Sequence, residues 1–548
     1  MIVAEAAGRA LFRAGAGTVF GLVGSGNFHI TNALIRAGAR FVPGRHEGGS
    51  ATAADAFARA GGGLGVLTVH QGPGVTNAVT GLAEAAKSRT PLLVLAPEAT
   101  SRLSNFWIDT GALAESVGAV PARMQSPETA VADALDACAT AIRERRTVLL
   151  AMPLDIQAAR YTGPDGAELP QPSFASEPCE PAEQAVTDLL AALAKARRPV
   201  FIAGRGARAG AARDSLRTLA GRCGALLATS AAARGLFVAD PFDLDVSGGF
   251  ATPAAAELIR GADLIVGWGC ALNMWTLRHG TLVGEGAVVV QVDADPAALG
   301  AHRPIDLGVH GDVALTARAV AARLEDRADG GYRTSEIAER LKQQGRWADV
   351  PFRPDREPSR IDPRTLSIAL NDLIPRQRTV AVDSGNFMGY PAMYLDVPDV
   401  DGMVFTQAFQ SIGLGLATAV GAAVARPDRL TVAALGDGGA LMAIAELETA
   451  VRLGLDLLIV VYNDAAYGAE VHHFGPHGDP LDTVRFPDTD IAAIARGFGC
   501  EAATVRTPED LSPVAAWLEG PRERPMLVDA KVATGSPSWW LEEAFRGH

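Results

Sequence analysis

The sequence predicts an α/β protein with three domains, each built on a doubly wound parallel sheet. Short apolar runs typical of buried strands alternate with amphipathic helical patterns through most of the 548 residues. The alternation stops twice, at a stretch rich in Pro, Gly and Ser at 162–182 and at a charged, Pro-containing stretch near 342–364. We therefore expect domains at 1–160, 184–325 and 362–548.

The expected strands of the first two domains are short apolar runs that end at Gly, Pro or polar residues. In the first domain we expect strands at Thr18–Val23, Phe41–Val42, Gly65–His70, Leu92–Ala96 and Val148–Met152, with helices at Asn27–Ala37, Gly49–Arg59 and Asn77–Ala86. In the middle domain we expect strands at Pro199–Ala203, Leu226–Thr229, Leu264–Trp268 and Val288–Val292. The turn Gly204-Arg205-Gly206 matches a nucleotide-binding turn only in part, so a plain structural turn is the favoured interpretation.

The composition excludes several classes of function. A net charge of −13 without a basic stripe argues against nucleic acid and anionic membranes as partners. No apolar run is long enough to span a bilayer, and the N-terminus lacks the apolar core of a signal peptide. The five cysteines have no CxxC spacing and fit reduced thiols. We expect a cytoplasmic protein whose substrate is a small molecule.

The third domain contains the stretch with the most specific chemistry. The apolar run Thr431–Leu435 breaks at Gly436-Asp437-Gly438-Gly439, and a helical pattern follows with Leu441, Ile444, Leu447 and Val451 on one face. A second apolar run, Leu457–Tyr462, ends in Asn463-Asp464. In a βαβ unit both strand ends open on the same edge of the sheet, so Asp437 and Asp464 should face each other. Two such carboxylates can hold Mg²⁺ beside a diphosphate, although a Gly-rich turn with two unrelated acids is the simpler alternative.

This pattern resembles the diphosphate motif of thiamine diphosphate enzymes, in the group of acetolactate synthase, benzoylformate decarboxylase and pyruvate decarboxylase. The resemblance implies a pyrimidine-binding first domain, a middle domain and a diphosphate-binding third domain. It implies Mg²⁺ bound by Asp437, Asp464 and the carbonyl of Ala466, and coenzyme contacts at Gly436, Gly438, Gly439, Tyr467 and Gly468. Most relatives carry Asn where this chain carries Asp464.

In the first domain, the segment around Glu47 resembles the segment of the family that carries the catalytic glutamate. The resemblance implies that Glu47 hydrogen-bonds the aminopyrimidine ring and takes part in its proton transfers. A carboxylate favoured by the dipole at a helix N-terminus is the alternative interpretation. The segment Val23–Phe28 also resembles Val382–Phe387 of the third domain, which would suit a duplicated α/β unit.

The segment His70–Asn77 resembles a turn that lines the active site of acetolactate synthases, so Gly72 and Asn77 are expected to contact the coenzyme. His70 lines up with the catalytic histidine of benzoylformate decarboxylase, and Ser25 with its active-site serine. Histidine is also the side chain that exchanges protons near neutral pH, whereas a buried structural histidine is the alternative.

Two further segments have a counterpart in the family. Residues 407–415 resemble the segment that bends the coenzyme, which implies contacts from Gln407 and an apolar wedge at Ile412; a buried helix residue is the alternative. His473 stands where acetolactate synthases carry a tryptophan, and it is a candidate catalytic residue, although a solvated lid is equally consistent with its Gly- and Pro-broken surroundings.

We expect a thiamine diphosphate- and Mg²⁺-dependent enzyme that decarboxylates a 2-oxo acid and, like acetolactate synthase, joins the product to a second carbonyl. Release of an aldehyde, as in benzoylformate decarboxylase, is the first alternative. A catalytically silent coenzyme-binding regulatory protein is the second. The family also implies a homodimer or homotetramer with active sites between subunits. FAD in the middle domain has only the support of the Gly204-Arg205-Gly206 turn.

Overall fold

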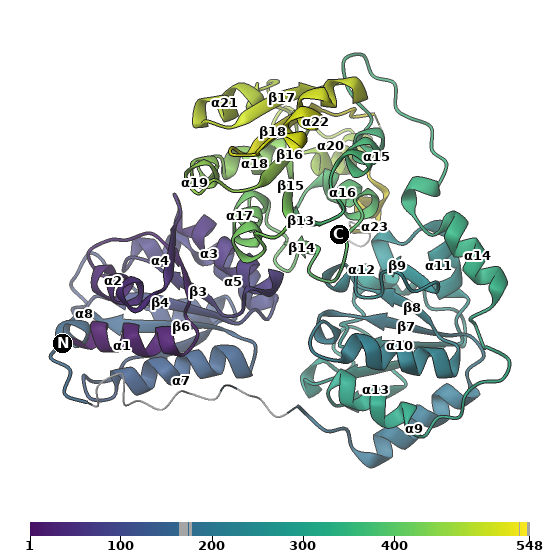
Figure 1. Ribbon diagram of the computed structural model, residues 1–548, viewed down its shortest axis with the longest axis horizontal. Helices are drawn as coiled ribbons and strands as arrows, with labels where there is room; N and C mark the ends of the chain where they lie inside the picture. The colour runs from purple at the N-terminus through teal and green to yellow at the C-terminus, as the bar shows by residue number, and fades with distance from the viewer. Residues whose placement is uncertain (164–173, 175–177, 536, 545–548) are drawn as a thin grey trace.

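Three six-stranded parallel sheets flanked by helices make up the protein in a computed structural model that describes residues 1–163, 174, 178–535 and 537–544. Figure 1 shows the first sheet in purple and blue, the middle sheet in teal and the third in green and yellow. The predicted α/β class with three parallel sheets is therefore confirmed. Most of the expected linker at 162–182 lies outside the described residues, and the exact bounds of the three domains stay predictions.

The first sheet has the strand order β2-β1-β3-β4-β6-β5, with every neighbouring pair parallel. Its strands are β1 (Thr18–Gly21), β2 (Arg40–Pro43), β3 (Gly65–Thr68), β4 (Leu92–Glu98), β5 (Val120–Arg123) and β6 (Thr147–Pro153). Its helices are α1 (Val3–Arg13), α2 (Phe28–Ala37), α3 (Glu47–Phe57), α4 (Pro73–Asn77), α5 (Val79–Lys87), α6 (Thr110–Ser116), α7 (Ala130–Arg143) and α8 (Leu154–Ala158). Helix α3 begins at Glu47 and not at Gly49, because the side chain of His46 accepts a hydrogen bond from the amide of Gly48 and caps it there.

The middle sheet has the order β12-β11-β10-β7-β8-β9, which is the strand order of dinucleotide-binding folds. Its strands are β7 (Pro199–Ala203), β8 (Leu226–Thr229), β9 (Asp243–Val246), β10 (Leu264–Trp268), β11 (Val288–Asp293) and β12 (Leu307–His310). Its helices are α9 (Glu183–Lys195), α10 (Ala212–Cys223), α11 (Pro253–Arg260), α12 (Met274–Leu277), α13 (Val313–Ala321) and α14 (Ser335–Gln344).

The third sheet has the order β14-β13-β15-β16-β18-β17, which repeats the order of the first sheet strand for strand. Its strands are β13 (Arg378–Val382), β14 (Met403–Phe405), β15 (Leu430–Gly436), β16 (Leu457–Asn463), β17 (Glu501–Val505) and β18 (Met526–Lys531). Its helices are α15 (Pro363–Leu373), α16 (Gly389–Tyr394), α17 (Gly415–Ala425), α18 (Asp437–Met442), α19 (Glu446–Arg452), α20 (Gly468–Phe474), α21 (Ile491–Phe498), α22 (Ser512–Glu519) and α23 (Trp539–Ala544). The shared order agrees with the similarity between residues 23–28 and 382–387.

The expectation of one continuous helix after the Gly-rich turn is wrong. Helix α18 ends at Met442, and α19 begins only at Glu446. Leu441 and Met442 are 38% and 59% exposed, so the apolar face of α18 does not continue into the core that buries Leu447. The chain turns at Ala443, whose backbone angles leave the helical range.

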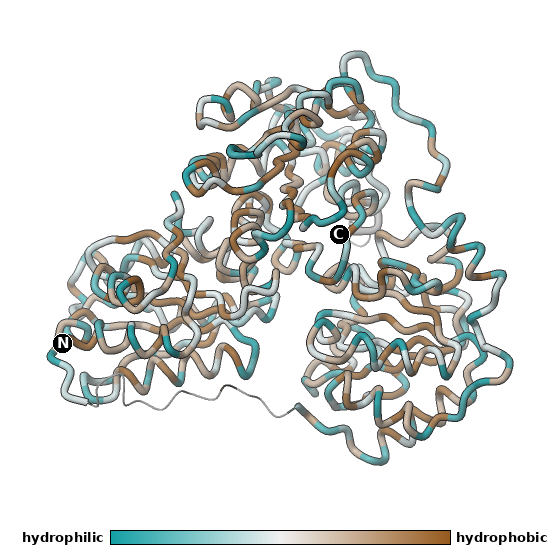
Figure 2. The backbone as a smooth tube through the Cα atoms, in the orientation of Figure 1, coloured by the Kyte–Doolittle hydropathy of each residue, from teal (hydrophilic) through white to brown (hydrophobic). Residues whose placement is uncertain are grey.

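One hydrophobic core joins the first domain to the third. Helices α3 and α17 pack against each other, and Ala51 and Ala54 of α3 belong to the same buried cluster as Leu416 and Ala419 of α17. Figure 2 shows the hydrophobic strands inside each layer and the hydrophilic segments around them. A Cβ atom on Gly421 would lie 2.1 Å from the carbonyl oxygen of Ala53, so this contact requires glycine. Among the described residues, no helix is both long and apolar enough to cross a membrane.

Gly421→Ala should destabilise the protein, although alanine is the better helix former. Its methyl group would meet backbone that cannot move aside, and overpacking of this kind costs about 1–3 kcal/mol. Gly221→Ala is the matched control, because Gly221 lies in α10 with open space around its Cβ position. The Gly221→Ala control should gain about 0.5–1 kcal/mol of stability, because alanine has a higher helix propensity than glycine. The midpoints of urea denaturation measure the stability of both variants. Equal shifts of the midpoint in the two variants would show that the α3–α17 contact is not tight.

Candidate active site

The turn after β1 carries Ser25 and is held by the fully buried side chain of Asn27. The Asn27 side chain accepts a hydrogen bond from the Gly24 amide (2.8 Å). It donates to the carbonyl of Leu22 (2.8 Å) and to Oγ1 of Thr68 (3.0 Å). The turn is therefore tied to the neighbouring strand β3, at whose carboxyl end His70 lies. Sequence reasoning placed Asn27 only at a helix start and missed this role.

Ser25 and His70 lie together, as their alignment with the family implied. Ser25 Oγ is 3.3 Å from His70 Nε2, and His70 Nδ1 is 2.8 Å from the carbonyl oxygen of Gln71. A carbonyl only accepts, so Nδ1 carries hydrogen and Nε2 is the nitrogen that can take up or release a proton beside Ser25. A Cβ atom on Gly24 would lie 2.2 Å from His70 Cδ2, which explains the glycine. Phe106 packs edge-on against the imidazole at 5.2 Å.

Glu47 approaches the same turn from helix α3. Asn77 Nδ2 donates a hydrogen bond to Glu47 Oε2 (3.0 Å). A Cβ atom on Gly74 would lie 3.4 Å from Glu47 Oε1 and 3.2 Å from His70 Cβ, so the two side chains flank this glycine. Gly72 adopts a positive φ of 67° and leaves room for the backbone of Phe106. The structure thus gathers Ser25, Glu47, His70, Gly72 and Asn77 at one edge of the first sheet.

Asp437 and Asp464 meet at the corresponding edge of the third sheet. Asp437 is buried as the first residue of α18, and Asp464 follows β16 directly. Their carboxyl groups lie close enough for the ionisation of one to oppose the ionisation of the other. Burial raises the pKa of both groups, and the charge of Asp437 raises the pKa of Asp464 further. Asp464 Oδ1 also accepts the amide of Ala466 (3.2 Å), which fixes the short loop after β16.

The other predicted residues of this loop surround the two aspartates. A Cβ atom on Gly468 would lie 2.2 Å from Asp464 Oδ2, and one on Gly438 would lie 2.6 Å from the ring of Tyr467. A Cβ atom on Gly436 would lie 3.2 Å from the ring of Phe387. The glycines therefore allow the loop after β16 and the start of α18 to approach closely.

Asp383, Ser384 and Asn386 contact the predicted coenzyme segments, and the sequence reasoning missed them. Asp383 is fully buried and accepts hydrogen bonds from the amides of Gly413 (3.0 Å) and Leu414 (3.2 Å). Burial raises the pKa of Asp383 to about 6. A Cβ atom on Gly439 would lie 2.5 Å from Asp383 Oδ2, so this carboxyl group joins two predicted coenzyme segments. The similarity of residues 382–387 to 23–28 was a usable signal, because Ser25 and Asn27 occupy the equivalent turn.

Polar atoms without a protein partner lie next to this group. Ser384 Oγ donates to Gln407 Oε1 (3.2 Å), while Gln407 Nε2 and Asn386 Oδ1 are buried and have no hydrogen-bond partner among the described residues. A Cβ atom on Gly468 would lie 2.9 Å from Asn386 Nδ2, so Asn386 borders Asp464. A buried polar atom without a partner is costly, and a bound polar ligand would satisfy it.

Ile412 and His473 lie in less constrained surroundings. Ile412 is partly buried in the turn before α17, directly before the Gly413 amide that Asp383 holds, and it is not a helix residue. His473 lies on α20, where its ring contacts Phe474 at 4.7 Å and His477 at 6.0 Å.

The donor set fits a magnesium ion that keeps ligands of its own. Two carboxylates and a backbone carbonyl are hard oxygen ligands, and they leave positions for water and phosphate oxygens. The charge of Asp437 raises the pKa of Asp464, so a cation bound between the two carboxyl groups would relieve their repulsion. No cluster of three or more His, Cys, Asp or Glu side chains suited to a metal occurs among the residues that the structure describes.

The Gly204-Arg205-Gly206 turn, which could have bound FAD, has a structural explanation. A Cβ atom on Gly204 would lie 2.3 Å from the carbonyl oxygen of Gly269, and one on Gly206 would lie 2.8 Å from the Gly269 Cα. Both glycines are therefore needed for the contact between the turns after β7 and β10. The turn gives no separate support to a flavin.

Family models of the thiamine pyrophosphate enzymes, which use the coenzyme also called thiamine diphosphate, match three parts of the chain. The N-terminal TPP-binding domain matches residues 1–122, the central domain 186–320 and the C-terminal TPP-binding domain 383–530. A probable 2-ketoarginine decarboxylase of Pseudomonas aeruginosa is 30% identical over 523 residues, which cover 92% of this chain and 90% of that protein.

Other similar proteins carry other activities. A sulfoacetaldehyde acetyltransferase of Rhodobacter capsulatus is 28% identical over 93% of this chain and 90% of its own length. An acetolactate synthase large subunit of Parasynechococcus marenigrum is 29% identical over 96% of this chain and 86% of its own length. In the solved structure of a thiamine diphosphate-dependent 4-hydroxybenzoylformate decarboxylase of Rhodococcus jostii the fold is the same. The two chains superpose with a TM-score of 0.82 at 22% sequence identity, and the match covers 98% of this chain and all of that one.

Removing the ionisable group of Asp464 should make the stability of the coenzyme-free protein depend less on pH. The raised pKa values mean that the folded chain holds a proton at neutral pH that the unfolded chain, with carboxyl pKa values near about 4, releases. Stability therefore falls as the pH rises from about 4 toward neutrality. Asp464→Asn should flatten this decline. Urea midpoints measured between about pH 5 and pH 8 in the presence of a chelator give this pH dependence of stability. Equal slopes in variant and parent would contradict the raised pKa of Asp464.

Proposed function

The chain belongs to the family of thiamine pyrophosphate enzymes, and we propose that it acts on a 2-oxo acid with thiamine diphosphate and Mg²⁺. The observation that carries the proposal is the Ser25–His70 pair beside Glu47, which provides a proton donor and a carboxyl group on either side of one turn. We infer that the reaction is decarboxylation of a 2-oxo acid to an aldehyde.

In this proposal the third domain holds the metal and the diphosphate. Asp437, Asp464 and the Ala466 carbonyl ligate Mg²⁺. The diphosphate contacts come from Gly436, Gly438, Gly439, Tyr467 and Gly468, and the remaining coenzyme contacts from Gln407, Ile412, Gly72 and Asn77. Gln407 Nε2 supports this assignment, because it has no hydrogen-bond partner in the described part of the chain and would gain one when a ligand binds.

Thiamine diphosphate, held by these residues, would supply a nucleophilic carbon and an electron sink for loss of CO₂ from the substrate. Glu47 would exchange a proton with the aminopyrimidine ring through its carboxyl group, which Asn77 orients. His70 carries the product's proton on Nε2, the nitrogen that faces Ser25, while the Gln71 carbonyl holds Nδ1 in place. Ser25 orients this nitrogen and the substrate carboxylate. His473 is a further candidate for moving protons.

Carboligation, in which the product adds to a second carbonyl, is the second candidate. The similarity to acetolactate synthases and sulfoacetaldehyde acetyltransferases over more than nine tenths of this chain favours it. Against acetolactate itself, Gly111-Ala112-Leu113 and His473 depart from the synthase pattern around the acceptor pocket.

The active site in this proposal lies between two copies of the chain. Large apolar side chains near the two predicted site edges are exposed in the single chain, including Phe28 (53%), Phe106 (44%) and Met442 (59%). A second copy would cover such side chains. The first domain of one copy would then supply Glu47 to the third domain of the other.

A panel of aliphatic and aromatic 2-oxo acids, with thiamine diphosphate and Mg²⁺, tests the reaction. We expect CO₂ and an aldehyde, with Glu47→Gln slower by about 10²–10⁴-fold, because it removes the proton-carrying group. His70→Ala should slow aldehyde formation about 100-fold, and Ser25→Ala less. Hydroxyketone or 2-hydroxy-2-alkyl acid products would favour the carboligase. Binding of the coenzyme with no turnover of any acid would contradict both reactions and favour a silent binding protein.

Mixing two inactive variants tests the shared site. When Glu47→Gln and Asp437→Ala subunits are unfolded, mixed and refolded together, half of the dimers are hybrids, and each hybrid has one intact site. About a quarter of the parent activity should return. Each variant refolded alone is the control. No recovery in mixed samples that contain hybrid dimers would show that the site lies within one chain.

A further inference from the structure

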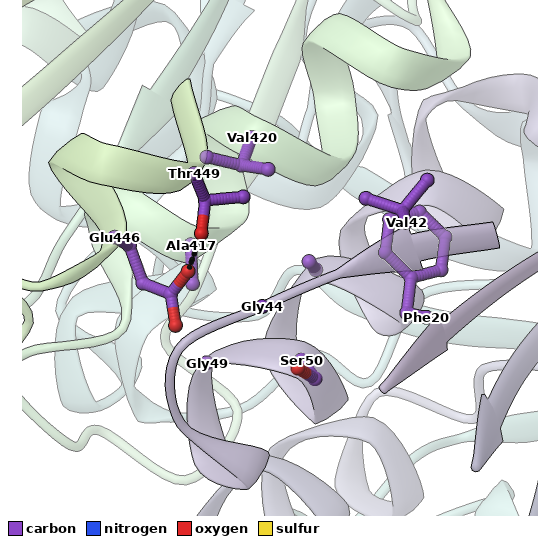
Figure 3. Close-up of a pocket in the computed structure, with 10 residues that line it drawn as sticks. Phe20, Val42, Gly44, Gly49, Ser50, Ala417, Val420, Glu446 and Thr449 are labelled. Atoms are coloured by element: carbon purple, nitrogen blue, oxygen red, sulfur yellow. Dashed lines mark hydrogen bonds between the residues drawn. The ribbon is translucent and has the colours of Figure 1, made fainter. Parts of the chain in front are cut away.

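A buried glutamate of the third domain holds the backbone that leads into Glu47. Glu446, only 4% exposed on α19, accepts hydrogen bonds from the amides of Arg45 (3.0 Å) and His46 (3.1 Å). The hydroxyl of Thr449 donates to its other carboxylate oxygen at 2.7 Å. Figure 3 shows the Glu446 side chain and its bond to Thr449 beside Gly44 and Gly49 of the first domain. The next residue after His46 is Glu47.

The first domain is shaped to receive this carboxylate. A Cβ atom on Gly49 would lie 2.5 Å from Glu446 Oε1 and would displace it. The two amides point outward from the N-terminal end of α3, where the helix dipole favours a negative charge. Hydrogen bonds from amides to an ionised carboxylate are among the stronger ones in proteins, and here water hardly competes with them.

A second buried glutamate makes the same contact in the opposite direction. Glu84, fully buried on α5 of the first domain, accepts hydrogen bonds from the amides of Ala408 (3.2 Å) and Phe409 (2.7 Å) of the third domain. Arg59 pairs with Glu84 (3.2 Å) and donates to the carbonyl of Phe405 (2.5 Å). These bonds hold the segment that contains Gln407.

We propose that Glu446 and Glu84 are reciprocal positioning residues, each fixing the coenzyme-contacting turn of the other domain. Glu446 acts through Glu47, and Glu84 acts through Gln407. The inference rests on the proposed function, because it assigns these turns to the active site. A positioning role differs from a role that only attaches the two domains to each other. Both carboxylates bind backbone amides within two residues of a predicted coenzyme contact, which favours positioning.

A double-mutant cycle distinguishes positioning from attachment. Glu446→Ala should lower kcat about 10- to 100-fold in the parent, because a small displacement of a catalytic group costs that much. In the Glu47→Gln background it should cause almost no further loss, since the group that it positions is already gone. Glu446→Gln keeps an acceptor oxygen and should restore most of the activity. The near-ultraviolet circular dichroism of bound thiamine diphosphate should change in Glu446→Ala as it does in Glu47→Gln.

Glu448→Ala is the matched control, because Glu448 lies on the same helix and binds the side chain of Arg45, not the backbone. It should leave kcat and the dichroism unchanged. Gly49→Ala is a second test that keeps the charge of Glu446 but displaces it, and it should reproduce the loss in a chain that still folds. Folding of each variant is checked by its thermal midpoint without coenzyme.

The outcomes separate this inference from the proposed function. Equal losses from Glu446→Ala in both backgrounds, or a lower thermal midpoint with unchanged kcat, would overturn the positioning role while leaving the function intact. Full activity of Glu47→Gln would instead overturn the function.

The Glu84 contact is tested in the same way with Glu84→Gln and Gln407→Ala, read as the dissociation constant of thiamine diphosphate. We expect each variant to weaken binding and the pair to weaken it no more than the stronger single variant.

Discussion

The close packing of helix α3 on helix α17 is the constraint on which the rest of the structure depends. The approach is tight enough to require glycine at position 421, and it merges the cores of the first and third domains. Both helices begin at predicted coenzyme contacts, because α3 starts with Glu47 and α17 starts just after Ile412. Fixing the two helices against each other therefore fixes the relative positions of the two turns within one chain.

Carboxyl groups serve three different physical purposes in this arrangement. Glu47 keeps an oxygen beside the Gly74 turn that is free for a ligand. Asp437 and Asp464 are held together against their own repulsion, which prepares them for a cation. Asp383, Glu84 and Glu446 each accept hydrogen bonds from backbone amides and hold the segments that contain those amides in place. All of these acids except Glu47 and the partly buried Asp464 are buried, and Asp437 is among the buried ones, so the distribution of partners, and not burial itself, separates ligand-facing acids from structural ones.

The fold and much of the site were predictable because both depend on short-range patterns. Parallel strands bring their carboxyl ends to one edge, so two aspartates at the ends of neighbouring strands, Asp437 and Asp464, had to meet. The break after Met442 was not predictable, since the apolar spacing continues through it. The role of Glu446 could not be predicted from the sequence either. The His46 amide that it binds is 400 residues away, and every residue except proline has such an amide, so no residue type marks the partner.

The crossed glutamates also have a consequence for the order of folding. Neither acid belongs to the domain whose turn it holds, so a first domain that has just left the ribosome lacks the carboxylate for the Arg45 and His46 amides. The amides of Ala408 and Phe409 in the third domain likewise find their acceptor on α5, which is synthesised earlier and must dock against the third domain. Completion of either turn therefore requires both domains, and a chain that ends before α19 leaves the Arg45 and His46 amides without this carboxylate.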